Sequence, residues 1–131
     1  MKENNSIKLF NELDKVEIND KVSLVNYIEN VKNKYPDIPD LILSLTGKVR
    51  IKDLIHMTFQ SDDQSIKYIV ICQKTEKVNV VLNKIYETKP EFKEYHHFFL
   101  GNGGSINEYK TFEENKIEDG NGITINRMEN D

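Results

Sequence analysis

The sequence contains no alanine, no tryptophan and only one cysteine, Cys72. A single cysteine cannot form an internal disulfide or a multi-cysteine metal site. No apolar run approaches the roughly 20 residues that a membrane-spanning helix needs. No apolar stretch typical of a secretory signal follows the first methionine. We therefore expect a cytoplasmic protein without membrane contact.

Arginine is also scarce, whereas lysine, asparagine and isoleucine are abundant. The codons of these three residues are AT-rich, and those of alanine and most of those of arginine are GC-rich. This bias favours an origin in a low-GC bacterium, or in a phage or other mobile element of one. It is an inference about codons and does not define an activity.

An excess of basic residues is missing too, because 18 Lys and Arg stand against 22 Asp and Glu, for a net charge of −4. Proteins that bind nucleic acids usually carry a basic face, so we do not expect a nucleic-acid partner. The length of 131 residues, with 37% apolar and 31% charged residues, suits one globular domain. We expect a single α+β domain over residues 1–131.

Helical periodicity is concentrated in the first third of the chain. Apolar residues recur at helical spacing over residues 6–16 and again over 21–35. A third, short helix is predicted over 39–46, because a proline suits its first turn and Gly47 suits its end. The sequence thus predicts a helical part over residues 1–47.

After Gly47 the apolar period changes to two. Strands are predicted over 49–60 and 66–74, joined by a short polar turn as a β-hairpin. Asp53 is a polar intruder on the apolar face of the first strand. Either Asp53 pairs with a neighbouring basic residue, or the strand begins later than the alternation indicates.

The remainder combines one helix with strand-like segments. We favour a helix near residues 76–87, although the same residues also alternate as a strand would. Further strands are predicted at 95–100, 105–112, 116–118 and 123–126, the last two as a hairpin around Asp119-Gly120-Asn121-Gly122. The predicted fold is N-terminal helices packed on an antiparallel β-sheet, with residues 48–131 mainly sheet.

Acidic residues gather near the C-terminus. Residues 1–86 carry a net charge of +1 and residues 87–131 carry −5, which together give −4. The simpler interpretation is that these acidic residues form a solvated surface without a specific role. The functional interpretation is an acidic face with exposed aromatic residues for a basic protein partner, since complementary fields accelerate association. The predicted partner-binding residues are Glu108, Tyr109, Phe112, Glu113, Glu114, Glu118 and Asp119.

Catalytic and metal motifs are weak. His96 and His97 are adjacent on a predicted strand and so point to opposite faces, and the only other histidine is His56. We predict no metal site, cofactor or catalytic residue, and we expect Cys72 to be a buried, inert thiol. A small enzyme that uses His96 or His97 with a carboxylate remains an alternative.

A second alternative is a helix-turn-helix DNA-binding regulator over residues 39–57, which the acidic charge disfavours. Our main hypothesis is a small acidic protein-binding domain. It would act as a stoichiometric inhibitor of a basic partner, as a toxin immunity protein or an inhibitor encoded by a phage or mobile element does.

Overall fold

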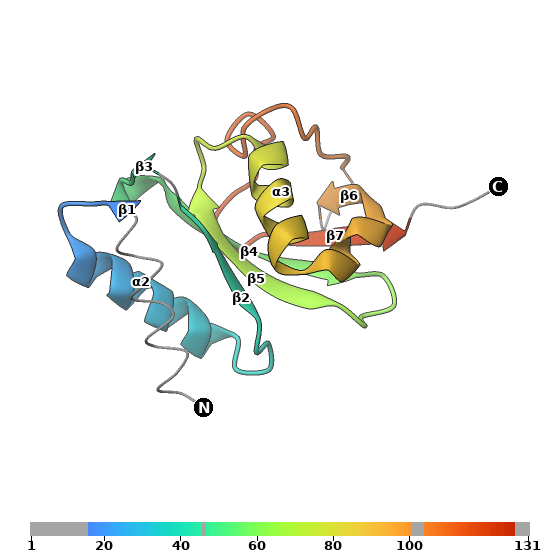
Figure 1. The fold of residues 1–131 in the computed structure, drawn as a ribbon, viewed down its shortest axis with the longest axis horizontal. Coiled ribbons are helices and arrows are strands. Elements are labelled where there is room, and N and C mark those ends of the chain that lie inside the picture. Colours follow the sequence, from blue (N-terminus) through green and yellow to red (C-terminus); the bar gives the residue numbers. More distant parts are fainter. Residues whose placement is uncertain (1–15, 46, 101–103, 128–131) are drawn as a thin grey trace.

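The computed structural model describes residues 16–45, 47–100 and 104–127 (Figure 1). Five strands form one sheet in the order β2-β5-β4-β7-β6. They are β2 (Leu41–Ser44), β4 (Leu54–Ser61), β5 (Lys67–Gln73), β6 (Tyr95–Leu100) and β7 (Gly122–Arg127). The other elements are the helices α2 (Lys21–Lys34) and α3 (Val78–Thr88), the short strands β1 (Val16–Glu17) and β3 (Gly47–Lys48), and the 3-10 helices η1 (Ile51–Asp53) and η2 (Pro90–Glu94). The α+β class is confirmed.

The sheet is mixed, so the predicted antiparallel sheet is wrong. β4 and β5 form an antiparallel hairpin, and β6 and β7 are also antiparallel. In contrast, β2 runs parallel to β5, and β4 runs parallel to β7. The parallel pairs join segments far apart in the chain, since a parallel pair needs a crossover connection. The alternation of apolar and polar residues within one segment does not show which distant strand it pairs with.

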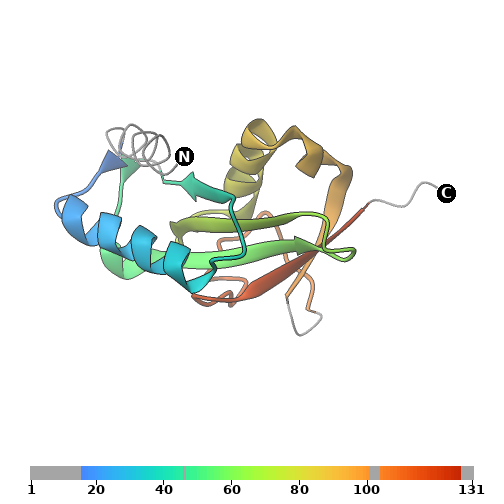
Figure 2. The ribbon, with the colours of Figure 1, turned by 90° about the horizontal axis from the view of Figure 1, so that it is seen from below.

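Each face of the sheet carries a helix (Figure 2). Tyr68, Val70 and Cys72 of β5 belong to the core under α3, and Ile69 and Ile71 to the core under α2. β5 is therefore apolar on both faces because it is buried on both. The buried residues of the helices are Val78, Val81, Leu82 and Ile85 in α3, and Leu24, Ile28 and Val31 in α2.

Helix α2 confirms the prediction for residues 21–35. The carboxylate of Asp20 caps its start and accepts hydrogen bonds from the backbone N–H and the hydroxyl of Ser23, at 3.0 and 2.6 Å. These bonds lower the pKa of Asp20. Lys32 and Lys34 lie in the last turn, where their charges interact favourably with the negative end of the helix dipole.

The other helix predictions for the N-terminal third have different outcomes. Nearly all of the helix predicted over residues 6–16 lies outside the described residues, and its last residue, Val16, belongs to β1. The helix predicted over 39–46 is wrong, because Leu41–Ser44 is strand β2, paired with Ile69–Cys72 of β5. A helix of four residues would form few of its backbone hydrogen bonds. As a strand, each of these four residues pairs with a residue of β5, which is buried on both faces.

The hairpin and the following helix are close to the prediction. β4 begins at Leu54, after η1, so the later start of the strand explains Asp53. The backbone oxygen of Asp53 accepts a hydrogen bond from the backbone N–H of Lys74 at 2.8 Å. α3 is a helix, as favoured, and its four buried residues form one stripe.

The C-terminal third contains two of the four predicted strands. β6 and β7 confirm the strands at 95–100 and 123–126. The strands predicted at 105–112 and 116–118 are wrong, because the described residues there form turns with single bridges. We call residues 104–121, which lead from β6 to β7, the C-terminal loop.

The C-terminal loop is bound tightly to the rest of the fold. α3 has no side-chain cap, and the backbone oxygens of Lys110 and Glu108 instead accept the N–H groups of Val78 and Asn79, at 3.0 and 2.8 Å. Phe112 and Ile117 are buried in the core under α3. The loop thus presents its remaining side chains on a fixed backbone.

Among the described residues, no helix has both the length and the apolar character needed to cross a membrane.

Candidate functional site

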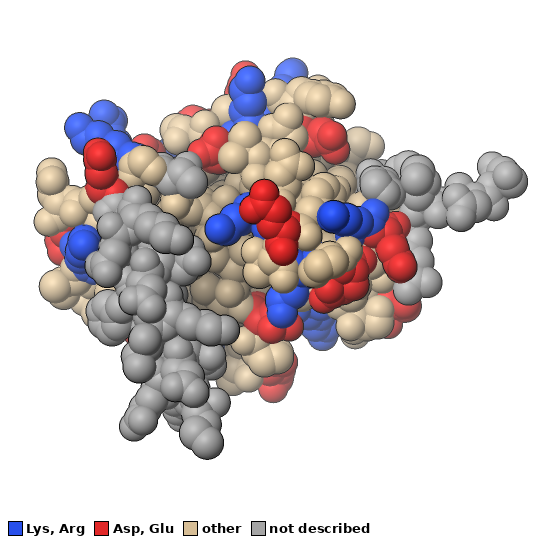
Figure 3. Space-filling model, viewed as in Figure 1, with Lys and Arg blue, Asp and Glu red and all other residues tan. Residues whose placement is uncertain are grey.

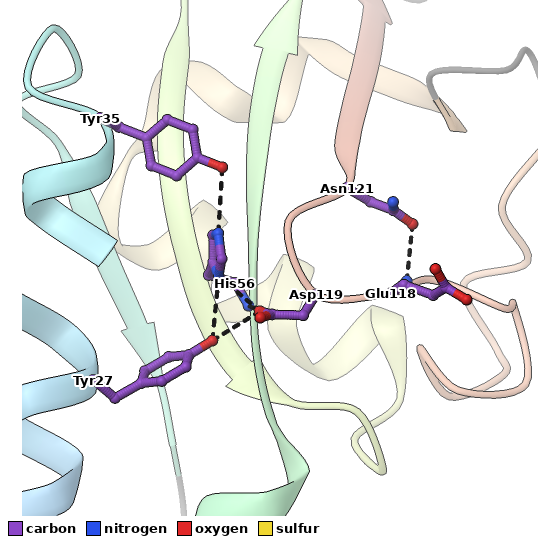
Figure 4. A network of polar contacts seen from close by, with 6 residues as sticks. All are labelled: Tyr27, Tyr35, His56, Glu118, Asp119 and Asn121. Atoms are coloured by element: carbon purple, nitrogen blue, oxygen red, sulfur yellow. Dashed lines mark hydrogen bonds and ion pairs between the residues drawn. The ribbon is translucent and has the colours of Figure 1, made fainter. Parts of the chain in front are cut away.

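A polar network joins α2, β4 and the C-terminal loop (Figure 4). It consists of Tyr27 in α2, Tyr35 at the end of α2, His56 in β4 and Asp119 in the loop. His56 lies on the face of the sheet that α2 covers, and it is 4% exposed. A buried imidazole needs hydrogen-bond partners, and this network supplies them.

A single oxygen of Asp119 holds the network together. Oδ1 lies 2.8 Å from the backbone nitrogen of His56 and 2.7 Å from its Nδ1. The hydroxyl of Tyr27 donates to the same oxygen at 2.9 Å. Half of the Asp119 side chain remains exposed. The carboxylate therefore connects strand and helix while its other side meets solvent.

The geometry also assigns the tautomer of His56. A 2.7 Å contact with a carboxylate oxygen places a proton on Nδ1, which donates to Asp119. When the ring is neutral, Nε2 accepts from the hydroxyl of Tyr35, at 3.2 Å. Both nitrogens thus have partners within the protein. A buried ring with both nitrogens bonded inside the protein is suited to joining α2, β4 and the C-terminal loop rather than to proton transfer to a substrate.

The phenol of Tyr27 stays protonated in this setting. Burial raises its pKa well above the ordinary tyrosine value, and the hydrogen bond to Asp119 raises it further. Burial disfavours the phenolate, and so does the negative charge of the carboxylate. Tyr27 is therefore a permanent donor to Asp119 at physiological pH.

Gly120 permits the close approach of the loop to β4. It has φ +88°, a conformation that glycine adopts at little cost. Its N–H donates to the backbone oxygen of His56 at 2.8 Å. A Cβ at this position would lie 3.8 Å from Nε2 of His56, which is an ordinary contact. The glycine is thus required for its backbone conformation and not for space.

The seven predicted partner-binding residues do not form one uniform surface. Glu114 has a structural role: its Oε1 accepts the backbone N–H of Thr111, and its own N–H donates to Oγ1 of Thr111, both at 3.0 Å. This reciprocal pair has the geometry of a capping box, and the hydrogen bonds from Thr111 lower the pKa of Glu114. Asp119 is committed to the network around His56.

Phe112 corrects a prediction. It is fully buried in the core under α3, so it is not an exposed contact for a partner. Its N–H donates to the backbone oxygen of Glu76 at 3.1 Å. A phenylalanine next to acidic residues resembles an interface aromatic in the sequence alone, but here it anchors the loop from inside.

Tyr109 is exposed, at 73%. Its backbone N–H donates to Oδ1 of Asn107 at 2.9 Å. Asn115 in turn closes the loop on Asn107: its amide oxygen accepts the N–H of Asn107, and its amide nitrogen donates to the Asn107 oxygen, both at 2.8 Å. Tyr109 is therefore an exposed aromatic side chain on a fixed backbone.

Glu113 and Glu118 are acidic residues of the loop whose carboxylates have no structural role in the ranges that the structure describes and can contact a partner. Both are exposed, and their carboxylates have no hydrogen-bond or ion-pair partner among the described residues. The N–H of Glu118 donates to Oδ1 of Asn121 at 2.8 Å, which fixes its backbone. Figure 4 shows the Glu118 carboxylate pointing away from His56, whereas Asp119 points toward it. Glu108, partly exposed, contributes its backbone oxygen to the start of α3.

The other predicted positions have simpler outcomes. His96 and His97 lie on β6, but their side chains fall outside what the structure describes. Residues 39–45 and 47–57 form strands and one 3-10 helix, so the described chain there has no helix-turn-helix. Cys72 is buried, as predicted, and burial raises the pKa of its thiol. In the described ranges, no group of three or more His, Cys, Asp or Glu residues could hold a metal ion.

Sequence reasoning does not find the network. In the sequence, His56 stands out only as a possible zinc ligand, and Tyr27 and Tyr35 only as members of a helix. Asp119 is 63 positions from His56 in the chain, and Tyr27 is 92 positions from Asp119. Contacts at such separations leave no local pattern in a single sequence.

Comparisons with known proteins bear on the fold. No protein-family model and no curated protein matches the chain. Among solved structures, a de novo designed protein based on ubiquitin matches with a TM-score of 0.50 and 13% identity, over 60% of this chain and 94% of the designed one.

Two structures of one Arabidopsis thaliana protein also match, at 18% identity each. One was determined from evolutionary couplings and sparse NMR data, with a TM-score of 0.49, and the match covers 63% of this chain and 95% of that one. The other is a solution NMR structure of the ubiquitin-like domain, with a TM-score of 0.48, and the match covers 60% and 85%. At these identities a likeness concerns the fold and carries no activity. The chain is thus similar in fold to the designed protein based on ubiquitin.

Proposed function

We propose that this protein is a protein-binding domain that uses its C-terminal loop to occupy a basic surface of one partner. Its action would be stoichiometric inhibition, as in a toxin immunity protein or an inhibitor encoded by a phage or mobile element. No covalent chemistry is needed for such a role. The loop offers charge and an aromatic side chain on a backbone that is already ordered.

The observation that carries this proposal is the division of roles among the acidic residues. Glu114 and Asp119 hold the loop together, whereas Glu113 and Glu118 are exposed and have no structural hydrogen bond to their carboxylates in the described part of the chain. Because the loop backbone is already fixed, binding orders only the side chains, which limits the conformational entropy that is lost. They also attract a basic partner over the range of a Debye length.

Within the C-terminal loop, five acidic residues outnumber two exposed lysines, Lys110 and Lys116. On the face shown in Figure 3, acidic and basic side chains are interspersed. Such a mixed surface does not select a partner of one charge. This supports a search for the contact on the C-terminal loop, where Tyr109 can serve as a central aromatic anchor.

The test is charge reversal that spares the structural acids. The double variant Glu113→Lys and Glu118→Lys changes the charge of the loop and leaves Glu114 and Asp119 intact. A matched control, Glu29→Lys and Glu87→Lys, makes the same change at exposed positions on α2 and α3. Tagged wild-type protein is used to capture a partner from the source cells, and each complex is then measured by sizing chromatography and titration.

We expect one stoichiometric partner, weaker binding at high salt, and a loss of affinity in the loop variant only. The expected loss is about tenfold or more, as for charge pairs at protein interfaces. Equal affinities of the loop variant and the control would remove the loop from consideration. A partner that binds both variants more tightly would contradict a basic contact surface.

A further inference from the structure

The two faces of the sheet are stabilised to different extents. Among the described residues, the core under α3 contains 18 buried residues, including four buried aromatic side chains from η2, β6 and the C-terminal loop. The core under α2 contains seven. Only three of these, Leu24, Ile28 and Val31, come from α2 itself. α3, the shorter helix, contributes four buried residues, and Val25 and Tyr27 of α2 are partly buried against the core under α2. Because hydrophobic stabilisation scales with buried apolar area, α2 has the weaker apolar attachment among the described residues.

The core under α3 does not depend on α2. It is built from β2, the four strands β4 to β7, α3, η2 and the loop, and it includes no residue of α2. The part of the molecule under α3 therefore keeps its own core when α2 is set aside.

Polar contacts add to the attachment of α2, beside the partly buried side chains of Val25, Tyr27 and Tyr35 that pack against the same core. Tyr27 donates to Asp119, and the hydroxyl of Tyr35 contacts Nε2 of His56. Both hydroxyls, and the half-exposed Asp119, can form equivalent hydrogen bonds with water once α2 moves away. Such contacts fix the position of a helix but contribute modestly to the free energy that holds it.

We propose that α2 is a releasable cover, which opens as a unit from the face of β4 and β5 while the rest of the fold stays intact. The hydroxyls of Tyr27 and Tyr35 hold α2 in the closed position, and we call these two hydroxyls the latch. Opening uncovers an apolar strip of Leu54, Ile69 and Ile71 beside His56. The strip fits an amphipathic helix from a partner, because it already accommodates α2 through residues at positions i, i+4 and i+7.

Native-state hydrogen exchange of the full chain tests the opening. Amides of α2 should exchange faster than those of α3 and β5, through an event that exposes less surface than global unfolding. The double variant Tyr27→Phe and Tyr35→Phe should accelerate exchange in α2 by about tenfold or more and change α3 little, since it removes two hydroxyl contacts. Tyr68→Phe is the control, because it removes a hydroxyl bond to Glu91 under the other helix.

A fluorescent peptide with the sequence of residues 20–36 is the probe for the uncovered strip. It should bind the latch variant more tightly than the wild-type protein, because α2 leaves the strip more often. Exchange of α2 together with α3 and β5 in every variant would overturn the proposal. Separate opening of α2 that the latch variant does not accelerate would overturn the role of the two tyrosines. Equal peptide binding to both proteins would overturn the docking strip.

Discussion

Asp119 holds His56 at two points at once: its Oδ1 lies 2.7 Å from the ring Nδ1 and 2.8 Å from the backbone nitrogen of the same residue. One carboxylate thus fixes both the orientation of the imidazole and the approach of the loop to β4. The same oxygen accepts the hydroxyl of Tyr27. Three parts of the chain that are distant in sequence meet at this atom.

Removal of this carboxylate should destabilise the protein. Asp119→Ala leaves the backbone N–H and Nδ1 of buried His56 without their acceptor, at a cost of about 1–3 kcal/mol in the free energy of unfolding. The lower part of that range is expected, because water can reach the half-exposed position. Asp119→Asn keeps an acceptor oxygen and should lose less. Urea unfolding of both variants, with Glu118→Ala as the exposed neighbouring control, measures the difference; an equal loss in all three would contradict this role for Asp119.

A side chain at Gly120 should destabilise the protein through the backbone conformation alone. Gly120→Ala forces a residue with a Cβ to φ +88°, which costs about 1–2 kcal/mol and should lower the melting temperature. Gly122→Ala is the matched control, because Gly122 is not at positive φ and the nearest atom to its added Cβ would be Oγ1 of Thr58, at an ordinary 3.6 Å. Thermal unfolding should therefore separate the two variants. Similar melting temperatures would show that the loop adjusts its backbone freely.

Sequence patterns predicted the elements whose signal is local. The helix at 21–35 shows its apolar stripe within its own residues, and the hairpin of β4 and β5 joins neighbours in the chain. The prediction for residues 41–44 failed because the flanking proline and glycine resemble helix signals. The strand there is decided by its pairing with residues 69–72, which are distant in the chain.

The same limit applies to the candidate site. The acidity of the loop is visible in the composition, and Tyr109, predicted as an exposed aromatic residue, is exposed. The burial of Phe112 and the roles of Glu114 and Asp119 could not be predicted, because each depends on how the loop folds against α3 and β4. A single sequence shows which residues are charged, but not which of those charges are already used inside the fold.

Cys72 should be unreactive while the protein is folded. Burial raises the pKa of its thiol, and the side chain is fully enclosed in the core under α3. The thiolate is the reacting species, so a thiol reagent at about pH 8 should modify Cys72 only through opening of that core. The labelling rate should rise with urea in step with global unfolding. Fast labelling of the native protein would show that the core under α3 opens locally.

Acid should weaken the fold through Glu114. Hydrogen bonds from Thr111 lower the pKa of Glu114 below the ordinary glutamate value of 4.5. A carboxylate with a lowered pKa in the folded state contributes stability above the unfolded value, and this contribution disappears as the pH falls through the folded value. The free energy of unfolding should therefore decrease as the pH drops below about 4.5.

The variant Glu114→Gln separates this carboxylate from the others. Its amide keeps an acceptor for Thr111 but cannot titrate, so its stability should depend less on pH in the acid range. Urea unfolding at several pH values between about 3 and 7 measures the slope for the variant and for the wild-type protein. Parallel slopes would show that other carboxylates, such as Asp20, whose pKa is also lowered, carry the acid sensitivity.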